Sequence, residues 1–310
     1  MQNILLTNGT ELTKLQEGVS ASGTNHAQVN NFDTAFGRPR NFLDNRFVYA
    51  VISQRAHGLS VGVNLNPDKG CNFNCIYCEV NRDEPGRAQK MDIKMMSLEL
   101  HNLLTMVFEG NLRQLAGFRN LPEELLVLKE VALSGDGEPT LCPNFAEVVR
   151  EVVHIRSQPR FPFFKIVLIT NSTELDLPAI KEGLKLLTSQ DEIWLKLDAG
   201  TQEYMDKINR GDVALKKVMA NILLIARERP VVIQSLFPLV KGEEPPSDEV
   251  EQYVQRLRDL KQAGAAISLV QVYSAHRRPH HPECGHVPLK CLSRIAQRVR
   301  ETAGLRAEVF

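Results

Sequence analysis

The segment NPDKGCNFNCIYC, residues 66–78, contains Cys71, Cys75 and Cys78 in the spacing C-x3-C-x2-C. It directly follows an apolar run, residues 60–65, whose composition predicts a β-strand. Thiolates are the preferred ligands of iron–sulfur clusters, and cubane clusters normally take four protein ligands. Three neighbouring cysteines without an obvious fourth therefore indicate a cluster with one iron open to an exchangeable ligand, such as an amino acid head group.

A structural zinc site is the alternative, with His57 or a histidine near the C-terminus as the fourth ligand. Zinc sites usually combine C-x2-C pairs, and the spacing here is different, so the pattern favours iron and sulfur. The other cysteines, Cys142, Cys284 and Cys291, are scattered along the chain, and disulfides are not expected by default in a cytoplasmic protein.

Composition places the chain among ordinary globular proteins. Of its 310 residues, 43% are hydrophobic and 24% are charged, which is enough for a substantial core. The 37 lysines and arginines equal the 37 aspartates and glutamates, so net charge gives no argument for nucleic-acid binding. Because no apolar run reaches about 18 residues and the N-terminus lacks the pattern of a secretion signal, we expect a cytoplasmic protein without a membrane segment.

Beyond Phe47, strand-like apolar runs alternate with helix-like stretches. This alternation predicts a parallel sheet with right-handed crossovers. Six such units are too few for a complete eight-fold barrel and suit an α/β fold of the partial (β/α)6 TIM-like type, although a doubly wound open sheet has the same periodicity. The expected strands are 60–65, 130–133, 165–169, 192–197, 231–236 and 267–272, and the expected helices are 98–115, 145–156, 178–187, 213–227, 248–262 and 289–302.

The start of the chain has a different character. Residues 1–45 are rich in Asn, Thr, Ser, Gly and Gln with little apolar periodicity, which predicts a partly irregular N-terminal arm. The barrel domain is expected at 46–310, and the run 47–52 predicts an extra strand at the barrel entrance.

Two polar motifs follow the second and third expected strands. The first, LSGDGEPT at residues 133–140, combines glycines, which let a ligand approach the main chain, with an acidic group that can pair with a cation. Alone it is only a turn signature, but its place after a strand favours a binding site. The second is Asn171 and Ser172, which suit either a helix cap or a site.

The fourth expected strand carries Lys196 and Asp198, which period-two alternation places on one face. Burying both inside a barrel is costly unless they pair with each other or with a ligand, so we expect a site in preference to a purely structural ion pair. Gln234, Gln271 and Tyr273, on the last two strands, are candidates to line the substrate side, or equally polar residues at the rim. All these motifs fall at the carboxyl ends of strands, the face that gathers active sites in barrels.

The cysteine segment, with aromatic Tyr77 before the third cysteine, resembles the cluster loop of the radical S-adenosylmethionine (SAM) superfamily. The resemblance implies that Cys71, Cys75 and Cys78 bind three irons of a 4Fe-4S cluster and that the fourth iron chelates the amino and carboxylate groups of SAM. It also implies cleavage of SAM to a 5′-deoxyadenosyl radical that abstracts hydrogen from a substrate, and an external electron donor of the flavodoxin or ferredoxin type.

The same resemblance assigns the other motifs. GDGEP is similar to the GGEP motif, with Asp136 in place of its first glycine, and Glu138 would hold the SAM ammonium. Lys196 stands where the superfamily often has serine, and it could bind the SAM carboxylate, contact an anionic substrate or neutralise Asp198. The implied SAM-binding residues are Tyr77, Gly135, Asp136, Gly137, Glu138, Pro139, Asn171 and Ser172, and the expected catalytic residues are Lys196, Asp198, Gln271 and Tyr273.

Within the superfamily, the stretches at 61–67 and 137–140 resemble the Fe–S oxidoreductase group related to wybutosine-type tRNA-modifying enzymes. Those enzymes carry a second cluster on cysteines that precede the SAM cluster, and this chain has no cysteine before Cys71. We therefore expect a small-molecule or nucleotide-like substrate, with tRNA modification or a non-catalytic metal-binding module as alternatives.

A histidine-rich stretch, 276–286, followed by Cys291, suits either an auxiliary metal site or a loop over the barrel. The loop is favoured, because two thiolates are too few for a cluster. Arg277 and Arg278 leave the sixth expected strand at the active-site face and could contact a phosphate or carboxylate.

Overall fold

The computed structural model describes residues 35–36, 42–275 and 279–310, which belong to one compact unit, Asn31–Phe310. Most of the predicted N-terminal arm, and Arg277 and Arg278, lie outside the described residues. Where the arm enters the described part, Phe42–Asp44 form a single 3-10 turn and Phe42 is buried in the core.

An eight-stranded sheet forms the centre of this unit, in the order β1-β2-β3-β4-β5-β6-β8-β10. All neighbouring pairs are parallel except β1 with β2, and within the described residues the edge strands β1 and β10 do not pair. The predicted partial barrel with an extra first strand is confirmed. The strands are β1 (Val48–Ser53), β2 (Gly58–Asn64), β3 (Leu128–Ser134), β4 (Lys165–Thr170), β5 (Glu192–Lys196), β6 (Val231–Leu236), β8 (Ile267–Tyr273) and β10 (Ala307–Val309).

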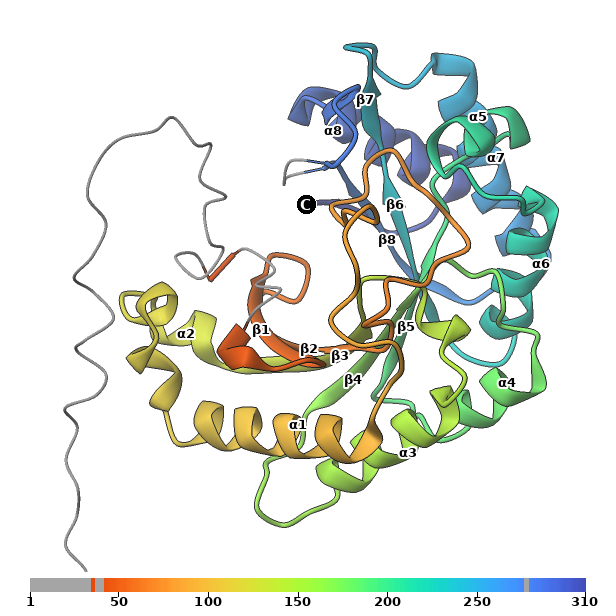
Figure 1. Cartoon of the computed structure of the whole chain (residues 1–310). Coiled ribbons are helices and arrows are strands. Elements are labelled where there is room, and N and C mark those ends of the chain that lie inside the picture. Colours follow the sequence, from red (N-terminus) through yellow and green to blue (C-terminus); the bar gives the residue numbers. More distant parts are fainter. Residues whose placement is uncertain (1–34, 37–41, 276–278) are drawn as a thin grey trace, which may run out of the picture. The chain divides into compact units, whose positions relative to one another are not determined.

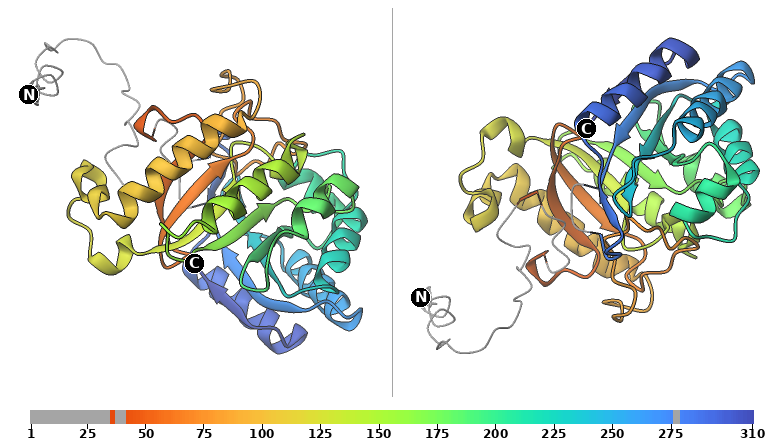
Figure 2. Two further views of the ribbon diagram at one scale, coloured as in Figure 1. Left: turned by 90° about the horizontal axis from the view of Figure 1, so that it is seen from below. Right: turned by 90° about the horizontal axis from the view of Figure 1, so that it is seen from above.

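The long helices cover the outer face of the curved sheet, as expected for connections between parallel strands (Figure 1; Figure 2). α1 begins five residues before the predicted start, because Asp92 caps it by accepting a hydrogen bond from the Met95 N–H (3.1 Å). The helices are α1 (Ile93–Phe108), α2 (Glu123–Leu126), α3 (Phe145–Arg156), α4 (Pro178–Leu184), α5 (Gln202–Ile208), α6 (Leu215–Ala226), α7 (Ser247–Gln262) and α8 (Leu289–Arg298).

Three short strands were not expected from the sequence, and neither were the short helices α2 and α5. β7 (Pro238–Val240) and β9 (Cys284–His286) pair in a separate antiparallel sheet, and β10 extends the main sheet beyond β8. Each has three residues, too few to show periodicity, and each depends on pairing with a distant part of the chain. The π-helical turn Val299–Ala303 follows α8 where one continuous helix was predicted.

The inner face of the sheet is organised in levels. Trp194, Val232 and Leu269 lie side by side on β5, β6 and β8 and belong to an apolar cluster separate from the main core. Two residues further along the same strands, Lys196 pairs in register with Gln234, which pairs with Gln271. The barrel interior is therefore apolar at its middle and polar toward the carboxyl ends of the strands.

Side chains span the open side of the barrel. The Arg55 guanidinium, from the turn between β1 and β2, lies 4.5 Å from the centre of the Tyr273 ring, and the His57 ring lies 5.8 Å from that of Phe310. These contacts connect the first hairpin to the last strands. They also place His57 away from the cluster loop, since His57 precedes β2 and the cysteines follow it.

Candidate active site

The loop after β2 carries Cys71, Cys75 and Cys78, each a half-buried free thiol. Every one of the three sulfur atoms accepts an N–H hydrogen bond. The Phe73 backbone donates to Cys71 (3.4 Å), Asn209 Nδ2 to Cys75 (3.4 Å) and Arg82 Nη1 to Cys78 (3.3 Å). Burial raises the pKa of the Cys75 thiol to about 12, so the free thiol stays protonated and needs an electrophilic partner to bind as thiolate.

The GDGEP turn packs directly against this loop. The Glu138 N–H donates to the Gly70 carbonyl (3.0 Å), and a Cβ added at Gly137 would lie 1.8 Å from the same oxygen, so only glycine fits. Asp136, at the departure from the GGEP pattern, is buried and accepts a hydrogen bond from Asn64 Nδ2 (2.8 Å) at the end of β2. The motif therefore joins the ends of β2 and β3.

Glu138 accepts four hydrogen bonds within the protein. Thr140 donates from its N–H (3.0 Å) and hydroxyl (2.6 Å), and Thr170 donates from its hydroxyl (2.5 Å). The Asn171 N–H donates to the other carboxylate oxygen (2.6 Å). Burial raises the pKa of Glu138 despite these bonds. Glu138 thus connects β3 to β4. It also caps the 3-10 turn that begins at the buried Pro139.

Asn171 and Ser172 lie where β4 ends, and both side chains make local contacts. Asn171 Oδ1 accepts the Thr173 N–H (3.1 Å) in an Asx turn that caps no helix, because α4 begins only at Pro178, while Nδ2 donates to Asn72 Oδ1 of the cluster loop (2.7 Å). Ser172 is fully buried, its hydroxyl donates to the Lys196 carbonyl (3.4 Å), and its φ of 70° lies in the left-handed region. Glycine adopts this conformation without strain, whereas a residue with a Cβ does not.

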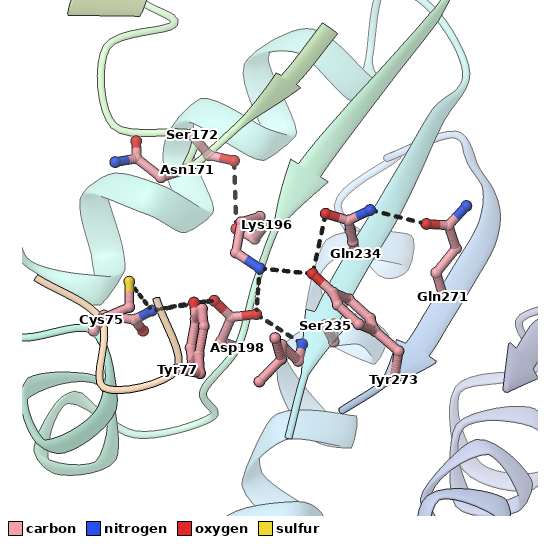
Figure 3. Close-up of polar contacts among 12 residues, drawn as sticks. Cys75, Tyr77, Asn171, Ser172, Lys196, Asp198, Gln234, Ser235, Gln271 and Tyr273 are labelled. Atoms are coloured by element: carbon pink, nitrogen blue, oxygen red, sulfur yellow. Dashed lines mark hydrogen bonds and ion pairs between the residues drawn. The ribbon is translucent and has the colours of Figure 1, made fainter. Parts of the chain in front are cut away.

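Lys196 and Asp198 share one face, as predicted, and form an ion pair with Nζ and Oδ1 3.2 Å apart (Figure 3). Burial alone would lower the pKa of Lys196, but the Asp198 carboxylate outweighs it and holds the pKa above its ordinary value. The other Asp198 oxygen accepts a hydrogen bond from the Tyr77 hydroxyl, whose own pKa is raised by burial and by this carboxylate. The aromatic residue of the cluster loop is thereby bound to the end of the fourth predicted strand.

From Lys196 a chain of hydrogen bonds crosses the strands (Figure 3). The ammonium donates to the Tyr273 hydroxyl (3.1 Å), and that hydroxyl donates to Gln234 Oε1 (3.2 Å). Gln234 Nε2 then donates to Gln271 Oε1 (3.1 Å). Every bond points the same way, so the chain ends in the Nε2 group of Gln271, which has no acceptor among the described residues. The structure brings the four predicted catalytic residues, Lys196, Asp198, Gln271 and Tyr273, into one network.

Two residues near the site escaped the sequence analysis. Asn209, which follows α5, donates to Cys75, Tyr77 and Asp198. Asn66, just before the cysteines, is buried, and its Oδ1 has no hydrogen-bond partner within the described part of the chain. Asn209 lies outside every motif, and Asn66 lies in the quoted segment 66–78 but was given no role. An Asn-Pro dipeptide before the cluster loop was the only signal for Asn66, and nothing in sequence indicated Asn209.

The alternatives to a cluster were a zinc site and an auxiliary metal site. Across residues 35–36, 42–275 and 279–310, no three His, Cys, Asp or Glu side chains are close enough together to hold one metal ion. Zinc would need four ligands around a single ion, with sulfurs about 2.3 Å from it. Thiolates of a cubane cluster bind different irons, so the three thiols need not surround a single ion. Cys284 and Cys291 are buried free thiols in β9 and α8. The donor set at the end of β2 therefore fits a cluster.

Comparison with known proteins identifies the class. Residues 65–257 match the family model described as the radical SAM superfamily, and the chain belongs to that superfamily. It is therefore an enzyme of the radical SAM type, a class that uses a 4Fe-4S cluster and SAM. In the described part of the chain, no helix has the length and apolar character needed to cross a membrane.

Individual relatives are more distant. A UPF0026 protein of Helicobacter pylori (strain J99) is 23% identical over 236 residues, covering 75% of this chain and 68% of the relative. A radical SAM methyltransferase from Sphaerobacter thermophilus has a TM-score of 0.57 at 16% identity, covering 85% of this chain and 68% of that one. TYW1 with a lysine-pyruvate adduct bound has a TM-score of 0.53 at 17% identity, covering 83% and 84%. The two structures share the fold of this chain.

Proposed function

We propose that Cys71, Cys75 and Cys78 hold the 4Fe-4S cluster and that the enzyme abstracts hydrogen from a small-molecule or nucleotide-like substrate. The observation that carries the proposal is that all three thiols lie on one loop at the carboxyl end of β2 and each accepts one N–H. Such bonds stabilise negative charge on thiolate ligands. Bound there, the cluster would supply the electron that cleaves SAM to methionine and the 5′-deoxyadenosyl radical.

For SAM, the proposed residues lie around the GDGEP turn. Gly137 packs so closely against Gly70 that no side chain fits, which brings the main chain of the turn against the cluster loop. A Cβ at Gly137 would also lie 2.7 Å from Asn66 Cβ, so the unpartnered Asn66 Oδ1 belongs to the same region. Because Glu138 already accepts four bonds, we assign the direct acceptor role for the ammonium to Asn66 Oδ1 and main-chain carbonyls, with Glu138 fixing the turn.

For the substrate, the proposed surface is the row Lys196, Gln234 and Gln271 with Tyr273. Its hydrogen bonds run from the ammonium toward Gln271, and bonds in such a chain polarise one another. The row therefore ends in a polarised N–H donor, which suits a substrate that presents a carbonyl, carboxylate or ring oxygen. Asp198 neutralises Lys196, so the row does not require a strongly anionic substrate.

Modification of tRNA is the second candidate, favoured by the fold shared with TYW1. The lysine-pyruvate adduct in that structure calls for a neutral amine on its lysine. Lys196 does not fit that role, because Asp198 keeps it as an ammonium. An external reductant of the flavodoxin or ferredoxin type is the proposed partner in either case.

The test is anaerobic reconstitution with iron and sulfide, followed by dithionite and SAM and quantification of 5′-deoxyadenosine. Wild-type protein should form it, and Cys75→Ala should reduce it by more than about 100-fold, because one cluster ligand is lost. Cys142→Ala is the matched control, since Cys142 is a buried thiol outside the loop, and it should leave the yield unchanged. Equal yields from wild type and Cys75→Ala would refute the assignment, and salt-sensitive binding of tRNA would favour the second candidate.

A further inference from the structure

Asn209 is a neutral side chain that donates a hydrogen bond to a predicted cluster ligand, Cys75, from outside the cysteine loop. It is 3% exposed, and its Nδ2 lies 3.4 Å from Cys75 Sγ, 2.9 Å from the Tyr77 hydroxyl and 3.1 Å from Asp198 Oδ2. The amide therefore lies between the cluster loop and the polar row of β5, β6 and β8.

The chain around Asn209 is fixed to the cluster loop. The Asn74 N–H donates to the Asn209 carbonyl (3.0 Å), and the Ile76 N–H donates to the Ile208 carbonyl (2.9 Å). Two residues on, a Cβ at Gly211 would lie 2.2 Å from the Phe73 ring, so this segment cannot shift without moving the loop. The packing of this backbone segment therefore fixes the position from which the Asn209 side chain reaches Cys75.

A primary amide has two hydrogens, and Asn209 has three acceptors within reach. Cys75 Sγ accepts from it directly, whereas Tyr77 and Asp198 are also bonded to each other. Hydrogen bonds to ligand sulfurs favour the reduced, more negative cluster and so raise its reduction potential. A neutral donor raises the potential without placing an additional charge close to bound SAM.

We propose that Asn209 is a positioning residue that raises the reduction potential of the cluster through its hydrogen bond to Cys75. The inference rests on the proposed function, since it requires the cluster on Cys71, Cys75 and Cys78. It adds a determinant from outside the cysteine loop, supplied by the turn after α5, and it makes electron transfer into the cluster easier for the external donor.

The test is a redox titration of the reconstituted cluster, followed by electron paramagnetic resonance, on wild type, Asn209→Leu and Asn209→Asp. Leucine fills the space and excludes water, and at a fixed potential it should leave about tenfold less reduced cluster relative to oxidised, a shift of about 59 mV for one electron. Aspartate replaces the donor by an acceptor and should lower the potential further.

Asn221→Leu is the matched control. Asn221 is also a buried asparagine, 2% exposed, but its Nδ2 donates to the carbonyls of Ser172 (2.9 Å) and Thr173 (2.8 Å) and not to sulfur. Its substitution should leave the potential at the wild-type value.

Three outcomes would overturn the inference alone, and a fourth would overturn the proposed function as well. An unchanged potential in Asn209→Leu overturns the inference, as does an equal shift in Asn221→Leu. Failure of both Asn209 variants to hold a cluster that wild type holds would also overturn it, because the amide would then serve retention and not potential. If wild type itself binds no cluster, the proposed function fails and not this inference alone.

Discussion

Two buried glutamates on one segment of the chain, Glu130 and Glu138, have opposite surroundings. Glu130 lies near the start of β3 and is 1% exposed, with one hydrogen bond from the Ser60 hydroxyl (3.1 Å) and an Oε2 that has no partner among the described residues. Glu138 follows the end of β3, is 3% exposed and accepts four hydrogen bonds. On β3, the mouth of the barrel, at the carboxyl ends of the strands, supplies donors to Glu138, whereas the floor, at the amino ends, leaves Glu130 poorly satisfied.

The pKa of Glu130 shows the cost of the floor position. Burial raises it from 4.5 to about 7, and the charge of Lys165 only partly offsets burial. A carboxylate that the fold merely tolerates is protonated near neutral pH, whereas four directed donors mark a carboxylate that the fold holds in place. Burial of a charged residue therefore says little about function until its partners are counted.

The strongest way to break this comparison is to replace each glutamate by glutamine. Glu138→Gln sets an amide N–H2 against backbone donors and should lower the free energy of unfolding by about 2 kcal/mol. Glu130→Gln should raise the free energy of unfolding by about 3 kcal/mol at pH 8, because glutamine stays neutral where a buried carboxyl with a pKa of about 7, against an ordinary 4.5, must ionise. Urea denaturation of the two variants beside wild type gives both values.

The raised pKa of Glu130 makes the stability of the protein depend on pH. Between pH 4.5 and 7 the unfolded chain releases the Glu130 proton while the folded chain keeps it, so wild-type stability falls as pH rises through this window. Glu130→Gln should lack this loss and be nearly neutral at pH 4.5. A destabilising Glu130→Gln at pH 8 would contradict the contrast between floor and mouth.

The next test compares two lysines. Lys196, at the mouth, pairs with an Asp198 whose side chain is 2% exposed, whereas Lys165, at the floor, pairs with a Glu192 whose side chain is 38% exposed (2.8 Å). Lys196→Met should cost about 3 kcal/mol, because it leaves a buried carboxylate without its cation, and Lys165→Met below about 1 kcal/mol. Thermal unfolding measures both, and equal costs would place the two pairs in the same class.

Much of the fold followed from periodicity alone. α3 occurs at Phe145–Arg156 and β6 at Val231–Leu236, as predicted, because each packs one apolar face on a large core and so keeps a clear pattern. The small sheet of β7 and β9 could not be predicted in this way. Its strands are separated by more than forty residues and exist through mutual pairing, which no local pattern records.

The site was predictable where strand alternation or a motif carried it. Lys196 and Asp198 were placed on one face by period two, and the GDGEP turn was found by its glycines. Asn209 could not be found, because its role arises only when the end of α5 meets the cluster loop. The helix-cap alternative for Asn171 was wrong, since its Oδ1 stabilises a turn and caps no helix, while its Nδ2 contacts the cluster loop.

The smallest expected effect concerns strain within the mouth itself. Ser172 holds a φ of 70°, which costs a residue with a Cβ about 1–2 kcal/mol, and its hydroxyl makes one long bond within the described residues, to the Lys196 carbonyl (3.4 Å). Ser172→Gly relieves that strain but makes the unfolded chain more flexible, which costs about 0.5–1 kcal/mol. The free energy of unfolding should therefore rise by about 0.5 kcal/mol.

Ser235→Gly is the control, because Ser235 lies in β6 and bonds the Tyr253 hydroxyl (2.7 Å), and it should lower stability by about 1–2 kcal/mol. Equal losses in both variants would mean that the buried serine hydroxyl, and not the left-handed backbone, decides stability at the end of β4.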